Sequence, residues 1–380
     1  MTQLRIKIGE HTTTEEILQW LDPNGKELTF LLTRSSGFEA GAEGLALSYL
    51  ANFLKHHDSI KIICEFTQPQ STIDFLNTIF SSTFGYALIR AAKEIVFPTN
   101  TKETTQEFRF FAGKIYDEKK GVIGLGEKIS VISFDPKRLI PKVLSPRQDS
   151  LDNDGLPLPS AFHTVLVNIL SGMGFPEIGS QNTLSTIIRF TYESYINTIQ
   201  HGLPTTQSVL KNSTRGISLS KIAFSTAQLA NRKMSTELRE YLLRIAEITK
   251  KDTNLFVVCI SVMDMGDGIQ NTLPSIANES DSVRLKRAFQ VGASRKVPSV
   301  IERGLGLHKV VDAAFRLNAK LRITSAGNVL WKDFSLGEDR YAGMDSALNA
   351  TLPKYFSSGT SIDIYIPSLM ENVDQRTLIA

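Results

Sequence analysis

ESYINTIQHG, residues 193–202, is the stretch that indicates the fold of this chain most clearly. Glu193 and Asn197 stand four positions apart, so a helix places them on one face. Their side chains carry oxygen ligands of the kind that suit magnesium or a water molecule. A glutamate beside a metal-bound triphosphate can hold or deprotonate the attacking water. The same spacing occurs on many solvated helices, so the neighbouring motifs decide its meaning.

A second motif, DMGDGI at residues 264–269, directly follows an apolar run that ends at Met263. A carboxylate at a strand end can accept a hydrogen bond from an amino group such as the exocyclic amine of adenine, and Asp264 occupies that position. The glycines beside it allow a flat ring to approach the backbone closely. A tight turn without a ligand is the alternative explanation for this motif.

Two further glycine motifs complete the set. RGLGLH, residues 303–308, precedes an apolar helical pattern, and glycines ahead of a helix leave backbone N–H groups that can hold phosphate. Gly359-Thr360 leads into a strand expected at residues 361–367. Close packing and a plain turn would explain these two motifs separately. The four motifs nevertheless occur in order, each on the element that a nucleotide site needs, and this favours nucleotide binding.

The four motifs together resemble the GHKL superfamily, with its helical asparagine motif, two glycine motifs and Gly-Thr motif, over roughly residues 160–370. Gyrase-type ATPases, heat-shock chaperones, histidine kinases and MutL-type repair proteins share this Bergerat ATP-binding fold. The resemblance implies a C-terminal Bergerat-fold domain in which helices cover a mixed sheet. It also implies that the chain binds ATP together with Mg²⁺.

The resemblance implies a role for each motif residue. Glu193 is the general base and Asn197 is the magnesium ligand, while Asp264 recognises adenine. The other nucleotide-binding positions that it implies are the supporting residues Gly268 and Thr360, the phosphate-lining residues Gly304 and Gly306, and Gly266, Ile269, Leu305, Leu307 and Lys296.

Two segments correspond to a lid and an insertion. Residues 270–302 correspond to the mobile ATP lid of the family. FQVGASRK, residues 289–296, resembles the lid motif before the second glycine motif, so Arg295 and Lys296 are candidates to touch the terminal phosphate. Two solvated loop cations are the alternative. The charged helical stretch 227–251 departs from the family pattern and is interpreted as an insertion, either a partner surface or a solvated decoration.

The proline-rich stretch LSPRQDSLDNDGLPLPS, residues 144–160, suits an exposed linker. We therefore expect an N-terminal domain at 1–145, a linker at 146–160 and the ATP-binding domain at 161–380. Alternating strands and helices before the linker predict a smaller α/β domain, which loosely resembles the STAS-type regulatory domains that accompany anti-sigma-factor kinases. The whole chain is expected to be α/β in class, built as an α+β two-layer sandwich.

Composition limits the function classes. The 380 residues allow two domains, and 42% hydrophobic residues are enough for their cores. The net charge of +3 is small and the basic residues are scattered, so nucleic-acid binding is not indicated. No apolar run approaches the ~20 residues of a membrane span. Cys64 and Cys259 lie in apolar runs that suit buried, reduced thiols. A cytoplasmic protein without membrane contact is expected.

Glu193 narrows the choice within the superfamily, because histidine kinases usually carry asparagine where the base would stand. We therefore expect a Mg²⁺-dependent ATPase that acts as a nucleotide-driven switch toward a protein partner or a second copy. A serine/threonine protein kinase similar to the anti-sigma-factor kinases is one alternative, and a nucleotide-binding module without turnover is another. The short segment after residue 367 leaves no room for the domain that supplies a catalytic lysine in gyrase and MutL. That lysine is expected to be missing or to come from elsewhere.

Overall fold

The computed structural model describes most of the chain, with gaps. Within the described residues the chain forms a four-stranded and an eight-stranded sheet with helices around both. The fold is therefore mixed α/β, in agreement with the predicted class. The described residues are 2–24, 26–68, 72–98, 104–134, 140–174, 181–274, 276–290, 306–335, 343–345 and 347–367.

The N-terminal part forms a parallel sheet in the order β1-β2-β3-β4. Its strands are short and rich in isoleucine and leucine, as expected for parallel strands that helices cover. Its elements are β1 (Thr2–Ile8), α1 (Thr14–Leu18), β2 (Lys26–Leu32), α2 (Glu43–Leu54), β3 (Ile60–Cys64), α3 (Thr72–Leu76), η1 (Ile79–Ser81), α4 (Thr83–Ala91), β4 (Ala92–Val96) and α5 (Thr104–Glu118).

The rest of the described chain contributes the strands of the larger sheet and the helices around it. Its elements are β5 (Val122–Leu125), β6 (Lys128–Phe134), η2 (Gln148–Ser150), α6 (Pro159–Gly172), α7 (Gln181–His201), α8 (Gln207–Asn212), β7 (Thr214–Phe224), α9 (Thr226–Asn231), α10 (Thr236–Thr249), β8 (Leu255–Asp264), η3 (Ile269–Thr272), α11 (Asp281–Ala288), α12 (Gly306–Arg316), β9 (Lys320–Ser325), β10 (Asn328–Asp333), β11 (Leu348–Thr351), η5 (Lys354–Phe356) and β12 (Thr360–Pro367).

The larger sheet has the strand order β11-β10-β9-β12-β8-β7-β6-β5. Every neighbouring pair in it is antiparallel, so the expectation of a mixed sheet in this region is wrong. Tight hairpins explain part of the difference. Ala326 and Gly327 both have positive φ, at 36° and 85°, and join β9 directly to β10. A connection this short can produce only antiparallel pairing.

The division between the two sheets falls earlier in the chain than the predicted linker. β5 and β6 precede residues 146–160, yet β6 pairs with β7 over its whole length, with Lys128 opposite Ser220. The predicted boundary at 146–160 therefore does not separate the two sheets, which divide between β4 and β5. The proline-rich composition marks the connection from β6 to α6, because a surface loop and an interdomain linker favour the same residues.

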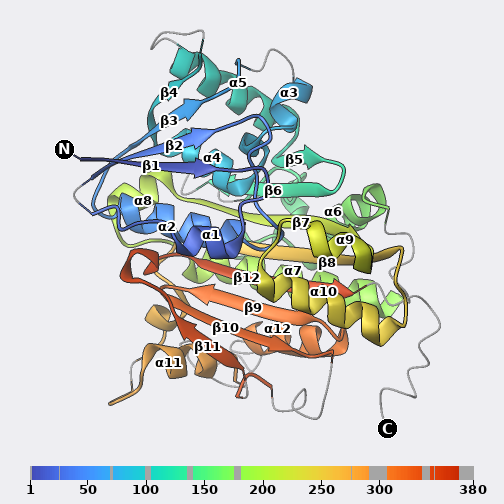
Figure 1. Cartoon of the computed structure of the whole chain (residues 1–380). Coiled ribbons are helices and arrows are strands. Elements are labelled where there is room, and N and C mark those ends of the chain that lie inside the picture. The colour runs from blue at the N-terminus through green and yellow to red at the C-terminus, as the bar shows by residue number, and fades with distance from the viewer. Residues whose placement is uncertain are drawn as a thin grey trace.

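Helices cover both faces of the eight-stranded sheet. On β8, Ile260 and Val262 face the core shared with α6, α7 and α12, whereas Cys259 and Met263 face the opposite side. That opposite side is covered by α2 and α4 of the N-terminal part and by α10 (Figure 1). Every residue of α2 is buried, because this helix lies between the two sheets.

The predicted helical insertion forms α9 and α10 and packs on the larger sheet. Tyr241 is 1% exposed and its hydroxyl donates to the Tyr365 carbonyl at 2.8 Å. Glu39 of the N-terminal part accepts the backbone N–H of Thr14 at 2.9 Å and that of Ser235 at 2.8 Å. One carboxylate therefore caps the starts of α1 and α10 together. α9 and α10 are therefore part of the core packing and are not a solvated decoration.

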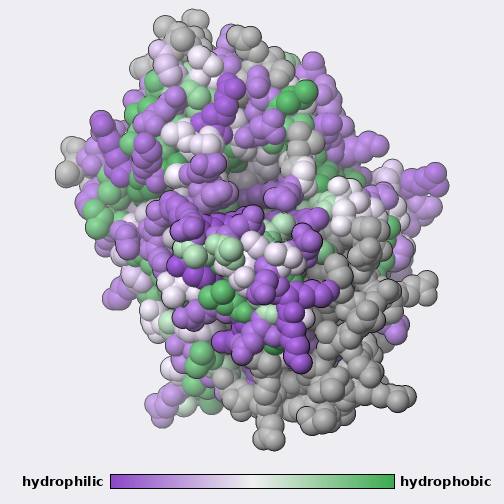
Figure 2. Space-filling view, turned by 45° about the vertical axis from the view of Figure 1, so that its right-hand side comes forward, coloured by the Kyte–Doolittle hydropathy of each residue, from purple (hydrophilic) through white to green (hydrophobic). Residues whose placement is uncertain are grey.

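Figure 2 shows a face in which hydrophilic residues predominate and hydrophobic ones are dispersed among them. Among the described residues, no helix combines the length and the apolar character that crossing a bilayer requires.

Candidate functional site

Helix α7 carries both polar residues of the first motif on one face. Asn197 Nδ2 donates to the backbone carbonyl of Glu193 at 2.7 Å, and both side chains are half-buried. This bond orients the carboxamide and leaves its oxygen for another partner. Burial, together with the nearby charges of Glu193 and Asp152, raises the pKa of Tyr192, so this neighbouring phenol stays neutral.

The first turn of α12 meets this face of α7. A Cβ added to Gly306 would lie 3.1 Å from Asn197 Nδ2 and 3.3 Å from Glu193 Oε2, so a side chain there would crowd both residues. On the same turn, Lys309 places its Nζ 2.6 Å from Glu193 Oε1. Reasoning from the sequence misses Lys309, whose signal is its position directly after the glycine motif, about one helical turn from Gly306.

Asp264 ends β8 and is buried, with 4% of its surface exposed. Its Oδ1 accepts the N–H of Gly266 at 2.8 Å. A Cβ on Gly202 would lie 2.7 Å from Asp264 Oδ2, and one on Gly266 would lie 2.5 Å from the Gly202 carbonyl oxygen. The end of the first motif and the start of the second therefore meet around this carboxylate, and both require glycine.

Strand β12 brings the Gly-Thr motif beside Asp264. Thr360 is the cross-strand neighbour of Asp264 in the antiparallel register. Gly359 before it has a φ of 75°, a conformation that favours glycine. Ser325 Oγ, at the end of β9, accepts the N–H of Ile269 at 2.8 Å and lies 3.4 Å from Thr360 Oγ1. Ser325 is another residue that the sequence motifs do not reveal.

The motifs surround a narrow cavity of about 40 Å³. Ser194 lines it and is 1% exposed, and its hydroxyl has no hydrogen-bond partner within the described part of the chain. Buried hydroxyls are normally paired, so Ser194 is a candidate to bond a ligand. The predicted residues that line the cavity are Asn197, Asp264, Gly268, Ile269, Leu307 and Thr360.

The other predicted residues form two groups: those that the structure describes next to the cavity, and those that lie outside the described part of the chain. Gly266 packs behind Asp264, and Glu193 lies one turn beyond Asn197, beside Gly306. The predicted residues that lie outside the described part of the chain are Lys296, Gly304 and Leu305, together with Arg295.

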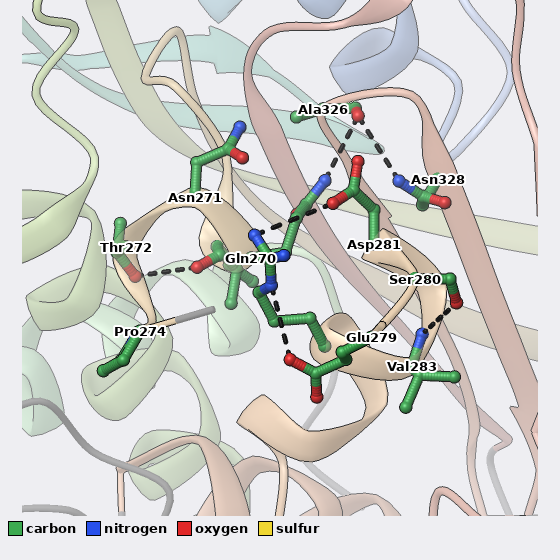
Figure 3. A network of polar contacts seen from close by, with 12 residues as sticks. Gln270, Asn271, Thr272, Pro274, Glu279, Ser280, Asp281, Val283, Ala326 and Asn328 are labelled. Carbon is green, nitrogen blue, oxygen red and sulfur yellow. Dashed lines mark hydrogen bonds and ion pairs between the residues drawn. The ribbon is translucent and has the colours of Figure 1, made fainter. Parts of the chain in front are cut away.

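The first part of the predicted lid forms η3 and α11. It makes hydrogen bonds to the larger sheet and within its own segment. Gln270 Nε2 donates to the Ala326 carbonyl at 3.1 Å (Figure 3). Glu279 accepts two hydrogen bonds from Arg287, at 2.7 and 2.8 Å. Residues 291–302 lie outside the described part of the chain, so the lid as a whole remains a prediction.

Helix α2 of the N-terminal part lies directly behind the Gly-Thr motif. Ser48 Oγ donates to the Phe356 carbonyl at 2.9 Å and also to the Ser358 carbonyl. Just after the helix, Lys55 Nζ lies 3.8 Å from Asp267 Oδ1, within the second motif. The N-terminal part therefore contacts the loops that carry two of the four motifs.

Comparison of the chain with protein-family models, with curated proteins and with solved structures finds no match. The chemistry of the site is therefore inferred from its own residues. The cavity combines a buried carboxylate and a buried hydroxyl with apolar walls at Val262, Ile269 and Ile362. Such a lining fits a flat ring that carries a hydrogen-bond donor. The carboxamide and carboxylate further along α7 add oxygen ligands for a cation.

Proposed function

We propose that this chain binds ATP in the cavity between α7, β8 and β12, as a GHKL-type protein whose C-terminal part has the Bergerat fold. The observation that carries the proposal is Asp264, a buried carboxylate that close glycines surround. A carboxylate in a narrow apolar cavity selects a hydrogen-bond donor, and the exocyclic amine of adenine is such a donor on a flat ring. Ser194 and Thr360 add hydroxyl groups to the same cavity.

The phosphates would follow α7 toward its N-terminal end. Leu307 lines the cavity, and the adjacent Gly306 begins α12 beside Asn197 and Glu193. A helix N-terminus suits phosphate because its backbone N–H groups and partial positive charge point outward. Asn197 would hold Mg²⁺ through its carboxamide oxygen, because Nδ2 is engaged with the helix backbone. The ion would offset the negative charge of the phosphates.

Hydrolysis is the reaction that Glu193 supports best. The water oxygen would form a bond to the terminal phosphorus while the bond from that phosphorus to the bridging oxygen breaks, which yields ADP and phosphate. Glu193 would accept the proton that the water loses. Its Oε2 lies beside Gly306 at the start of α12, the helix end near which a phosphate would bind. The contacts of α2 would carry the effect of nucleotide binding to the N-terminal part.

Calorimetry with Mg²⁺ and ATP tests the binding site. We expect wild type to bind ATP. Asp264→Asn should lose at least about 10-fold in affinity, because a carboxamide replaces the buried carboxylate that would accept the hydrogen bond from adenine. Asp267→Asn is the matched control, because this second acid of the motif bonds Lys55 and the Thr205 N–H instead of lining the cavity. Wild-type affinity in Asp264→Asn contradicts the adenine assignment, and no binding by wild type contradicts the proposal. Release of phosphate separates hydrolysis from transfer to a protein hydroxyl and from binding alone.

A further inference from the structure

Lys309 is the part of the site that the proposed function leaves unexplained. It lies on the first turn of α12 with its Nζ 2.6 Å from Glu193 Oε1, and the two side chains are 27% and 16% exposed. Glu193 Oε2 faces Gly306 instead of the lysine. This half-buried ion pair therefore joins the proposed base to the helix whose start would hold the phosphates.

The order of residues along α7 places the pair at one end of the proposed nucleotide. Gly202, just after the helix, packs against Asp264 at the adenine end. Asn197 lines the cavity about one turn before it, and Glu193 stands one turn further back. A nucleotide with its base at Asp264 and its magnesium at Asn197 therefore has its terminal phosphate beside Glu193 and Lys309.

A second ion pair joins the same two helices at a position further from Gly306. Arg189 Nη1 lies 4.0 Å from Asp312 Oδ2, about one turn along each helix, and Asp312 also pairs with Arg316 at 2.9 Å. Val310 and Ala314 of α12 are fully buried in the core that includes α7. The two helices therefore have other contacts to hold them, and a cation at Lys309 is not needed for that purpose.

We propose that Lys309 recognises the terminal phosphate of ATP, and that Glu193 is its partner only until ATP binds. This inference rests on the proposed ATP site. A terminal phosphate carries more negative charge than a carboxylate, and the flexible lysine stem lets the ammonium move from one to the other. When Lys309 leaves Glu193 Oε1, that oxygen becomes available to accept the proton of the attacking water. ADP lacks the γ-phosphate of ATP and leaves the pair in place.

The preference for a triphosphate over a diphosphate tests this role. We expect wild type to bind a non-hydrolysable ATP analogue more tightly than ADP in the presence of Mg²⁺. Lys309→Met should reduce this preference by about 10-fold or more, because a charge-assisted hydrogen bond is lost, while ADP affinity stays within about twofold. Lys309→Arg keeps the cation and should retain most of the preference. Arg189→Met removes the other interhelical pair and should behave as wild type.

The possible results distinguish a failure of the proposed Lys309 role from a failure of the proposed ATP site. A Lys309→Met protein with the wild-type preference overturns the inference while the proposed ATP site stands, and so does a wild type that binds ADP and the analogue equally. A wild type that binds neither nucleotide overturns both proposals. If methionine prevents folding, judged by thermal melting, Lys309→Gln keeps a polar side chain at this half-exposed position and carries the same expectation.

Discussion

Gly44 of α2 and Ser361 of β12 touch across the boundary between the two sheets, and a Cβ on Gly44 would lie only 2.2 Å from Ser361 Oγ. Ser361 follows Thr360 of the Gly-Thr motif, so the helix from the N-terminal part packs against the strand that lines the candidate site. Ser48, one turn along α2, bonds the loop before the same motif. A shift of this strand would therefore change the contacts that α2 makes with it.

The first prediction concerns this close approach. Gly44→Ala should lower the free energy of unfolding by about 1–3 kcal/mol, because the added methyl group overpacks a buried contact. Gly113→Ala is the matched control, since this helical glycine of α5 has no atom within 4 Å of the added Cβ. The control should be neutral or stabilise by up to about 1 kcal/mol. Chemical denaturation measures both, and equal effects would contradict the packing argument.

The second prediction concerns a buried ionic network beneath α10. Arg322 is 5% exposed and its Nε donates to Asp363 at 3.2 Å, while Nη1 lies 3.8 Å from Glu237. Arg322→Met should cost about 3–5 kcal/mol, because Asp363 is fully buried and loses its countercharge. Arg244→Met removes a more exposed pair and should cost less than about 1 kcal/mol. A similar small loss in both variants, by urea denaturation, would show that the network contributes little.

The third prediction is a pH dependence that arises from Glu237. Burial by itself raises the pKa of this carboxyl, but the charges of Arg322 and Lys320 outweigh burial and hold its pKa below the ordinary value of 4.5. The folded protein therefore binds this proton less readily than the unfolded chain, so the stabilisation is present above pH 4.5 and is lost as the pH falls through the folded value. Glu237→Gln should destabilise near neutral pH and have a shrinking effect below pH 4.5. An effect that stays constant across the denaturation series would contradict this origin.

The four motifs were predictable because each is local in sequence. A spacing of four residues on a helix decides that Glu193 and Asn197 share a face, and a glycine after a strand marks a close approach. The structure then brings Asn197, Asp264 and Thr360 to one cavity. Their convergence could be expected only from the order of all four motifs, because none of the local patterns specifies its partner.

The features that were missed depend on contacts between distant parts of the chain. Lys309 and Ser325 matter because of what lies opposite them in space, Glu193 on α7 and Thr360 on β12. β5 and β6 join the larger sheet although they precede the proline-rich connection, because a strand pattern does not specify the sheet that it joins. The position of α2 between two sheets is tertiary packing of the same kind, and its signal in the sequence is a helix with few polar residues on any face.

The fourth prediction separates affinity from stability at Ser194. Its buried hydroxyl has no hydrogen-bond partner among the described residues, so Ser194→Ala should leave the unfolding free energy unchanged or raise it slightly. If the hydroxyl bonds adenine, the same change should weaken nucleotide binding by about 2- to 10-fold. Titration with a fluorescent ATP analogue and thermal melting measure the two effects. Unchanged affinity would remove Ser194 from the site, and reduced stability would show a structural role instead.

The last prediction separates turnover from binding and concerns Glu193. Glu193→Ala should slow phosphate release by roughly 100-fold or more, the usual scale for loss of a positioned base. ATP affinity should hold or increase, because the variant removes a negative charge beside the phosphates and leaves Lys309 without its 2.6 Å partner. The ATP-bound form should therefore accumulate, which makes this variant the one with which to capture a partner or a second copy.

The control for that experiment is Asp312→Asn. It also removes a carboxylate from the contact between α7 and α12, but one that pairs with Arg189 and Arg316 away from Gly306. It should release phosphate at the wild-type rate, because Asp312 neither lies beside Gly306 nor pairs with Lys309. Phosphate release and nucleotide affinity should be measured side by side on the three proteins. Equal slowing in both variants would assign the effect to packing of α12, whereas wild-type release by a folded Glu193→Ala protein would exclude Glu193 as the base.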